Sequence, residues 1–205
     1  MKLLDKLINN IKFDKKYVLF SVIIIMLGII TGSLFIVILN DADKNIVIEY
    51  ISSFIQNTNN INTINILKNT LITNYICIFT LIIIGYSCFL FPINILILFY
   101  KAFIMGFTIS SFILTYKIKG IFLAITYIIP HLIINILIFA LITAFTLRLS
   151  LNMIKYIIKR KDVNIRCYFN KYFSLILLSI FIITLTSLYE SYLMPDLLKL
   201  IIKIL

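Results

Sequence analysis

The sequence predicts an all-α polytopic membrane protein with five transmembrane helices, its N-terminus inside the cell and its C-terminus outside. The 205-residue chain is 62% hydrophobic, with a mean hydropathy of +1.10, whereas soluble domains are about 45–50% apolar. Its apolar residues are gathered in runs long enough to cross a bilayer. Its basic excess, a formal net charge of +11, flanks those runs. We therefore expect a single integral membrane domain over residues 1–205.

The first expected span is "YVLFSVIIIMLGIITGSLFIVIL", residues 17–39. It carries no charge, and its 23 residues suffice for about 30 Å of hydrocarbon at about 1.5 Å of rise per residue. A signal peptide has a shorter apolar stretch and a small-residue cleavage site. The sequence therefore indicates an uncleaved first span.

A second apolar region is too long for one helix and must be divided. Pro92 interrupts it, because proline lacks a backbone donor and disfavours helix in the preceding residue. The stretch "YKIKG", residues 116–120, interrupts it again. The uncharged turn at Pro92 leaves open whether residues 85–101 are re-entrant, which membranes tolerate only under protein cover. The remaining expected spans are 71–91, 93–115, 121–147 and 172–193.

Orientation follows from the basic residues. The tail before the first span has five lysines, and the segment 148–171 has seven lysines and arginines. Both should face the cytoplasm, which requires an even number of spans between them, and four are counted. The segment 40–70 then lies outside the cell, and 148–171 is a basic cytoplasmic loop.

The outside segment contains an expected amphipathic helix in "DKNIVIEYISSFIQN". Its apolar residues repeat at helical spacing and form one face. Such a helix lies on the outer leaflet or offers its face to a partner protein, and both can hold at once. The partner-binding candidates are Ile46, Tyr50, Ile51 and Phe54.

Small residues four apart predict close helix packing within the membrane. Lipid provides no hydrophobic drive for helix association, so helices meet through close backbone contact and hydrogen bonds. Gly28 and Gly32 form such a pair in the first span, in a chain with only five glycines. Ala102, Gly106 and Ser110 repeat the spacing in the third. The spacing leaves open whether the contact is within or between chains.

Lys101 lies about 12 Å into the third span by helical rise. A charge at that depth is costly and marks a candidate site. Glu190, near the outer end of the fifth span, is the one acidic residue within the spans. Carbonyls freed by Pro92 are alternative acceptors. We favour a structural anchor over a proton or ion relay.

His131 is the only histidine and follows Pro130. Because Pro130 frees a carbonyl one turn earlier, near Thr126 or Tyr127, a polar side chain is needed there. Asn135 shares the face of His131, so the pair is predicted to brace helices. Intramembrane CAAX-type proteases also have histidine followed by asparagine four residues later, but they add paired glutamates and a second histidine, which this chain lacks. No catalytic residues, cofactor or metal site are therefore expected.

Other function classes are weaker. Nucleic-acid binding is disfavoured because the basic residues flank hydrophobic spans and no soluble recognition module has room. The three cysteines show neither zinc spacing nor a disulfide framework. A transporter or permease subunit is the alternative function, motivated by Lys101, Asn135 and the broken apolar region, although no internal repeat is visible.

Several stretches together resemble the stage II sporulation protein M family of bacteria and archaea. They are "LGIITGSLF", the outside helix, "FPINILILFYKAFIMGFTISSF", "GIFLAITYIIPHLIINI" and a fifth span after a basic segment. The likeness covers nearly the whole chain, including the order of spans. Many relatives read Pro-His-Gly with a following glutamate, where this chain has Leu132 and Asn135; this favours the sporulation branch.

The resemblance implies a non-enzymatic scaffold at the septal and engulfing membrane during endospore formation. Proteins of this kind recruit and hold membrane-anchored peptidoglycan hydrolases, which resemble an amidase/endopeptidase and a lytic transglycosylase. The other expected partner is the lipid bilayer. Whether the protein forms a homo-oligomer is left open by the sequence.

Overall fold

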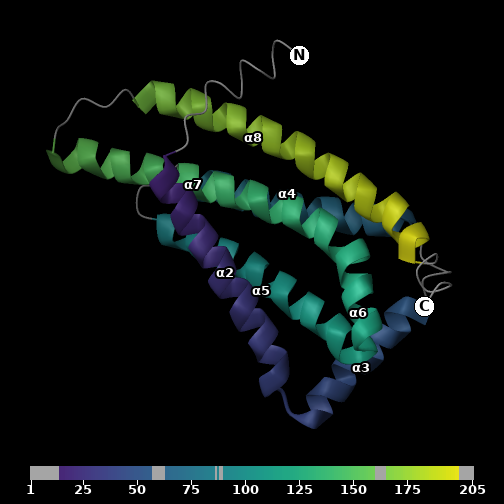
Figure 1. Ribbon diagram of the computed structural model, residues 1–205. Helices are drawn as coiled ribbons and strands as arrows, with labels where there is room; N and C mark the ends of the chain where they lie inside the picture. Colours follow the sequence, from purple (N-terminus) through teal and green to yellow (C-terminus); the bar gives the residue numbers. More distant parts are fainter. Residues whose placement is uncertain (1–13, 57–62, 86, 88–89, 160–164, 199–205) are drawn as a thin grey trace.

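The computed structural model describes residues 14–56, 63–85, 87, 90–159 and 165–198, and within these ranges its regular structure is entirely helical (Figure 1). Five helices are long and apolar enough to cross a membrane. The expectation of an all-α protein with five spans is thus confirmed. The spans comprise α2 (Lys15–Ile38), α4 (Thr63–Gly85), α5 (Phe91–Tyr116), α7 (Ile129–Lys159) and α8 (Ile165–Leu188), the last continued by η3 (Tyr189–Leu193).

The helix ends gather at two opposite ends of the bundle. The start of α2, the end of α7 and the start of α8 lie at the left in Figure 1, whereas α3 (Asp41–Gln56) and α6 (Ile118–Leu123) lie at the lower right. An ion pair of 2.9 Å between Arg148 Nε and Asp14 Oδ2 joins α7 to the residue before α2. The residues at the start of the first span and those at the start of the basic segment therefore share one side. That this side is cytoplasmic stays a prediction.

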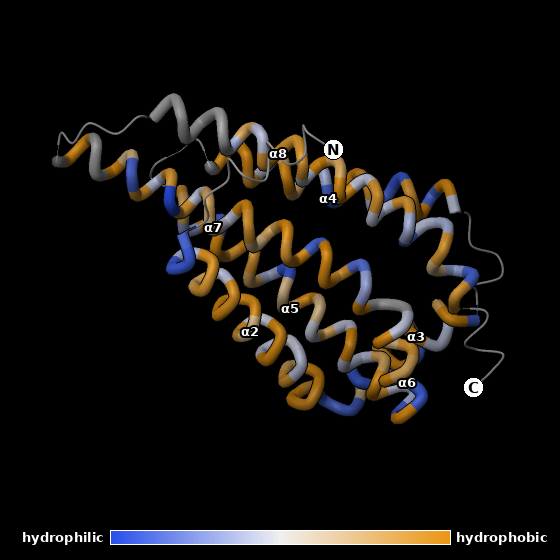
Figure 2. Tube along the Cα trace, turned by 45° about the horizontal axis from the view of Figure 1, so that its top comes forward, coloured by the Kyte–Doolittle hydropathy of each residue, from blue (hydrophilic) through white to orange (hydrophobic). Residues whose placement is uncertain are grey.

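Figure 2 shows apolar residues over most of the length of the spans, with hydrophilic residues prominent at the junction of α2 and α3. Large apolar side chains on α2 point outward, including Leu27 at 52% and Ile38 at 78% exposure. In a soluble protein such a surface would favour aggregation, whereas in a bilayer it faces lipid tails.

The tightest helix contact joins α2 to α5 through the predicted small residues. A Cβ built on Gly28 would lie 2.6 Å from Ala102 Cβ, and one built on Gly32 would overlap backbone atoms of α5. A Cβ on Gly106 would overlap a carbonyl of α2. Ser110 follows one turn later and is half-buried. The contact that the sequence left open is therefore within one chain.

The second span differs from its expected bounds of 71–91. Helix α4 begins at Thr63 and ends at Gly85, so the last residues of the expected outside segment 40–70 belong to this helix. It begins early because Lys68 and Asn69 are exposed on its surface, where polar side chains do not oppose helix formation. It ends early at Gly85, where a Cβ would overlap the hydroxyl of Tyr172.

Pro92 lies in the first turn of α5, where its missing N–H costs no helical hydrogen bond. The helix then runs without a break to Tyr116. From residue 91 onward the chain is therefore an ordinary span, without a re-entrant bend. Lys117, with a φ of 53°, ends it inside the predicted "YKIKG" break.

The fourth and fifth spans each contain a π-helical turn before a proline. The segment η2 (Ala124–Ile128) joins α6 to α7 and ends two residues before Pro130, and η3 ends two residues before Pro195. Wider i→i+5 turns of this kind accommodate irregular helix hydrogen bonding. The fourth span continues as α7 to Lys159, past the expected end at 147, and α8 begins at Ile165, before the expected 172. Most of the expected basic loop 148–171 is therefore helical.

Tyr172 fixes the end of the bundle opposite α3. Its side chain is fully buried, and its hydroxyl donates to the Leu81 carbonyl over 3.0 Å. Its ring stacks on Phe145 with centroids 5.8 Å apart. One side chain of α8 thus holds α4 and α7 together.

Candidate functional site

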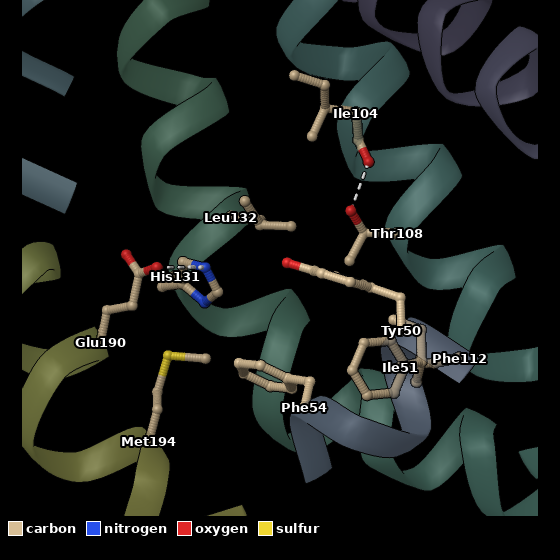
Figure 3. A pocket seen from close by; sticks show the side chains of 10 residues that line it. All are labelled: Tyr50, Ile51, Phe54, Ile104, Thr108, Phe112, His131, Leu132, Glu190 and Met194. Carbon is tan, nitrogen blue, oxygen red and sulfur yellow. Dashed lines mark hydrogen bonds and ion pairs between the residues drawn. The ribbon is translucent and has the colours of Figure 1, made fainter. Parts of the chain in front are cut away.

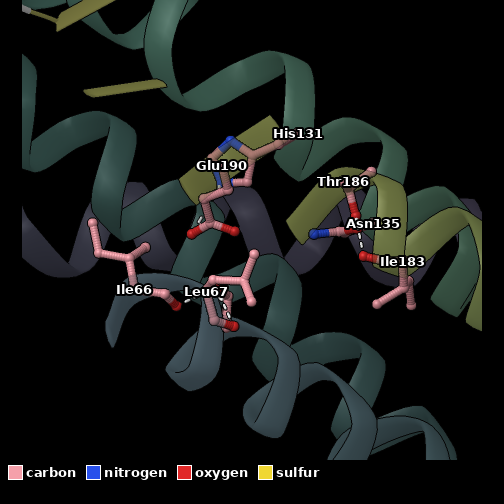
Figure 4. A network of polar contacts seen from close by, with 8 residues as sticks. Ile66, Leu67, His131, Asn135, Ile183, Thr186 and Glu190 are labelled. Carbon is pink, nitrogen blue, oxygen red and sulfur yellow. Dashed lines mark hydrogen bonds and ion pairs between the residues drawn. The ribbon is translucent and has the colours of Figure 1, made fainter. Parts of the chain in front are cut away.

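His131 and Glu190 face each other across the interior of the bundle (Figure 4). His131 Nε2 lies 4.0 Å from Glu190 Oε1, and the two side chains are 9% and 23% exposed. His131 is in the first turn of α7, just after η2, and Glu190 is within η3. His131 thus follows one π-helical turn and Glu190 lies within another, and such turns are frequent at functional sites.

One turn along α7, Asn135 contacts the same neighbouring helix. Thr186 Oγ1 donates to Asn135 Oδ1 over 2.7 Å, and both residues are buried. The Thr186 hydroxyl also lies 3.0 Å from the Ile183 carbonyl. Interhelical hydrogen bonds of this type hold membrane helices together. The structure thus connects the predicted His131–Asn135 face to α8 and η3.

Lys101 lies on α5 beside this face. It lines a cavity of about 50 Å³ together with Asn74 and Asn135, and a space of that size is large enough for a water molecule. Its Nζ lies 5.4 Å from the ring centroid of Phe139, within the range of a cation–π contact. It also interacts electrostatically with Glu190.

These side chains form one polar cluster inside an apolar bundle. Residues of this type are rare within membrane spans and pair with one another when they occur. The polar cluster comprises Asn74, Lys101, His131, Asn135, Thr186 and Glu190.

A larger cavity of about 260 Å³ opens between α3, α5, α7 and the end of the fifth span (Figure 3). Tyr50 and Ile51 of α3 lie on one side of it, and His131 and Glu190 lie opposite. The Tyr50 hydroxyl points into the space. We call this space the α3 cavity. The rest of its lining is provided by Phe54, Ile104, Thr108, Phe112, Leu132 and Met194.

The predicted partner-binding face of α3 is divided by the structure. Ile51 is only 7% exposed and packs against the bundle, and Phe54 is half-buried in the wall of the α3 cavity. Ile46 and Tyr50 are 64% and 70% exposed. Helix α3 thus uses Ile51 to dock on its own bundle, and a role of Ile51 in partner binding stays a prediction.

Sequence reasoning did not join Glu190 to His131, and it did not single out Asn74 or Thr186. Polar residues within apolar spans are the signal that could have found them. Within the described ranges, no group of three or more His, Cys, Asp or Glu residues is placed to hold a metal ion. Cys77 is a free thiol, and Cys88 and the side chain of Cys167 lie outside what the structure describes.

The five spans and the buried polar cluster define a multi-pass helical membrane protein. The chain matches the family described as stage II sporulation protein M over residues 21–195, and it belongs to this family. No match is found among curated proteins or solved structures. Membership of the family suggests a membrane protein related to sporulation.

Proposed function

We propose that this protein is a non-enzymatic membrane scaffold that recruits and anchors peptidoglycan-degrading enzymes at the septal and engulfing membrane during endospore formation. The proposed partners are membrane-anchored and resemble an amidase/endopeptidase and a lytic transglycosylase. Family membership supports the setting. The observation that carries the proposal is the outer face of α3, which keeps apolar side chains exposed while its inner face holds the helix in place.

The exposed residues Ile46 and Tyr50 support the proposal because they leave apolar side chains beyond the part of α3 that packs on the bundle. They lie on α3 at the end of the bundle opposite the Asp14–Arg148 ion pair. By the charge distribution, that end faces the cell wall. An aromatic and an aliphatic side chain on a firmly docked helix are typical anchors of a helix–protein contact.

Co-purification of the hydrolases from sporulating cells tests this role. We expect Ile46→Lys and Tyr50→Lys to lower recovery of the hydrolases severalfold while leaving the level of the scaffold unchanged. Asn45→Lys is the matched control, because it adds the same charge to an exposed polar position of the same helix. Full recovery with both α3 variants would remove this face from the proposal.

The polar cluster favours a second candidate, a transporter or permease subunit. Lys101, Asn74 and Asn135 surround a small cavity within the membrane, and intramembrane charges frequently mark transport paths. In proteoliposomes, this alternative expects ion or solute flux that Lys101→Met abolishes. The scaffold role expects no flux with either protein.

A further inference from the structure

The α3 cavity combines aromatic walls with a carboxylate. Tyr50, Phe54 and Phe112 contribute rings, and Glu190 lies on the opposite wall. A cation in such a site is attracted by ring faces and by the negative charge together. An apolar body with a basic end therefore matches this lining.

Glu190 lacks a close permanent cation. Its one ion-pair partner among the described residues is His131, at 4.0 Å, and histidine is charged only when protonated. Lys101 acts on Glu190 electrostatically, but its ammonium group lies against Phe139 on a neighbouring part of the cluster. A carboxylate inside a membrane bundle is stabilised by a cation at ion-pair distance, and the α3 cavity beside Glu190 has room for one.

The position of the cavity along the helices favours a protein side chain over a lipid headgroup as the source of that cation. Glu190 lies eight residues before Leu198, the last described residue of the fifth candidate span, which corresponds to about 12 Å of helix. Thr108, on the α5 wall, lies eight residues before Tyr116, the end of that helix. A lipid headgroup stays in the interface, whereas a side chain on a membrane-spanning helix reaches this depth.

We infer that the α3 cavity binds a basic side chain, lysine or arginine, of a membrane anchor helix from a partner protein, with Glu190 as its counter-ion. The inference rests on the proposed scaffold role, since it assigns the site at which membrane-anchored partners are held. The apolar stem of the basic residue packs among the aromatic rings, and its charged end reaches Glu190. Tyr50, at the cavity edge, links this site to the exposed face of α3.

The test uses the full chain in nanodiscs of phosphatidylcholine and phosphatidylglycerol, with a synthetic single-span leucine–alanine peptide as the probe. One peptide carries a lysine eight residues from its outer end, and its control carries methionine there. Energy transfer between labels on chain and peptide reports binding. We expect the lysine peptide to bind about tenfold more tightly than the methionine peptide. In Glu190→Gln, the affinity for the lysine peptide should fall to that for the methionine peptide.

Two further variants keep the test independent of any effect of Glu190→Gln on folding. Thr108→Phe fills the cavity without changing its charge and should weaken binding of the lysine peptide. Thr80→Phe is its control, because Thr80 is a partly exposed residue of α4 that is not part of the cavity lining. Equal binding of both peptides, or an unchanged lysine preference in Glu190→Gln and Thr108→Phe, would overturn the inference.

Nanodiscs of phosphatidylglycerol alone, which lack the cationic choline headgroup, separate lipid from protein. An unchanged affinity and lysine preference support an anchor helix, whereas markedly tighter binding without choline would show that a lipid ammonium occupies the site and would overturn the assignment. Hydrolase recovery from cells with Ile46→Lys, at a residue outside the cavity lining, tests the scaffold role separately. If hydrolase recovery depends on α3 but the lysine and methionine peptides bind equally, only the cavity inference is removed. If the peptides are discriminated but hydrolase recovery does not depend on α3, only the scaffold role is removed.

Discussion

Gly28, Gly32 and Gly106 lie where the backbones of α2 and α5 touch. At each of them a Cβ would meet atoms of the opposite helix, and at Gly32 and Gly106 these are backbone atoms that no side-chain rotation can move. Ser33, next to Gly32, bridges the same contact through its hydroxyl, which lies 3.4 Å from the Gly106 carbonyl. Close approach of this kind replaces the hydrophobic drive that lipid does not provide.

We predict that Gly32→Ala destabilises the folded protein by about 1–3 kcal/mol, because the added methyl group forces the helices apart. Unfolding by sodium dodecyl sulfate in mixed micelles measures the change. Val37→Ile adds a similar volume on the same helix, at a site that is 69% exposed, and should change stability little. A Gly32→Ala protein as stable as the parent would mean that the two backbones are not in contact.

The hydrogen bond between Thr186 and Asn135 should be measurable as a coupling between α7 and α8. Thr186→Val leaves the Asn135 amide without this partner, and we expect a loss of about 1 kcal/mol. A double-mutant cycle with Asn135→Leu isolates the pairwise contribution, which should be about 0.6 kcal/mol or more. Strict additivity of the two single changes would contradict the contact.

At the scale of elements, α3 shows how one amphipathic helix serves two surfaces. Ile51 and Ile55 pack with Phe112, Leu123 and Leu198, so the helix is held by the ends of three other segments. Its opposite edge stays exposed. The same helix therefore closes the α3 cavity and presents a surface at the end of the bundle.

Ile51→Lys should release α3 from the bundle, because a charge would enter a buried apolar cluster at a cost of several kcal/mol. Ile46→Lys should leave α3 in place. Alkylation of a cysteine introduced at Phe112, itself only 3% exposed, reports the difference. We expect fast labelling in the Ile51→Lys background and protection in the Ile46→Lys background; equal protection in both would show that α3 does not cover Phe112.

The elements also show what hydropathy can and cannot predict. The five spans follow from apolar runs, Pro92 and the "YKIKG" break, because each acts through local chain chemistry. The start of α4 at Thr63 was missed because asparagine, threonine and lysine on an exposed helical surface look like a loop in sequence. The pairing of His131 with Glu190 was missed because periodicity fixes a face within one helix and does not specify which residues meet across two helices.

At the scale of the whole molecule, the two ends of the bundle differ in character. One end brings together Asp14, Arg148 and the buried Tyr172, and it is near the basic segments. The other end carries α3, the α3 cavity and the polar residues that reach into the membrane. This polarity suits the proposed scaffold role with partners on one face, and its direction in the cell determines whether α3 can meet enzymes that act on the cell wall.

The most direct test of this account is a pair of fusions to the full chain that report on membrane sidedness. Alkaline phosphatase, active only outside the cytoplasm, and a fluorescent protein that matures only inside it are fused separately after Leu205. We predict an active phosphatase and no fluorescence at Leu205, because five spans carry the chain from an inside N-terminus to an outside C-terminus. Fluorescence without phosphatase activity at Leu205 would contradict the orientation and, with it, every partner surface assigned to α3.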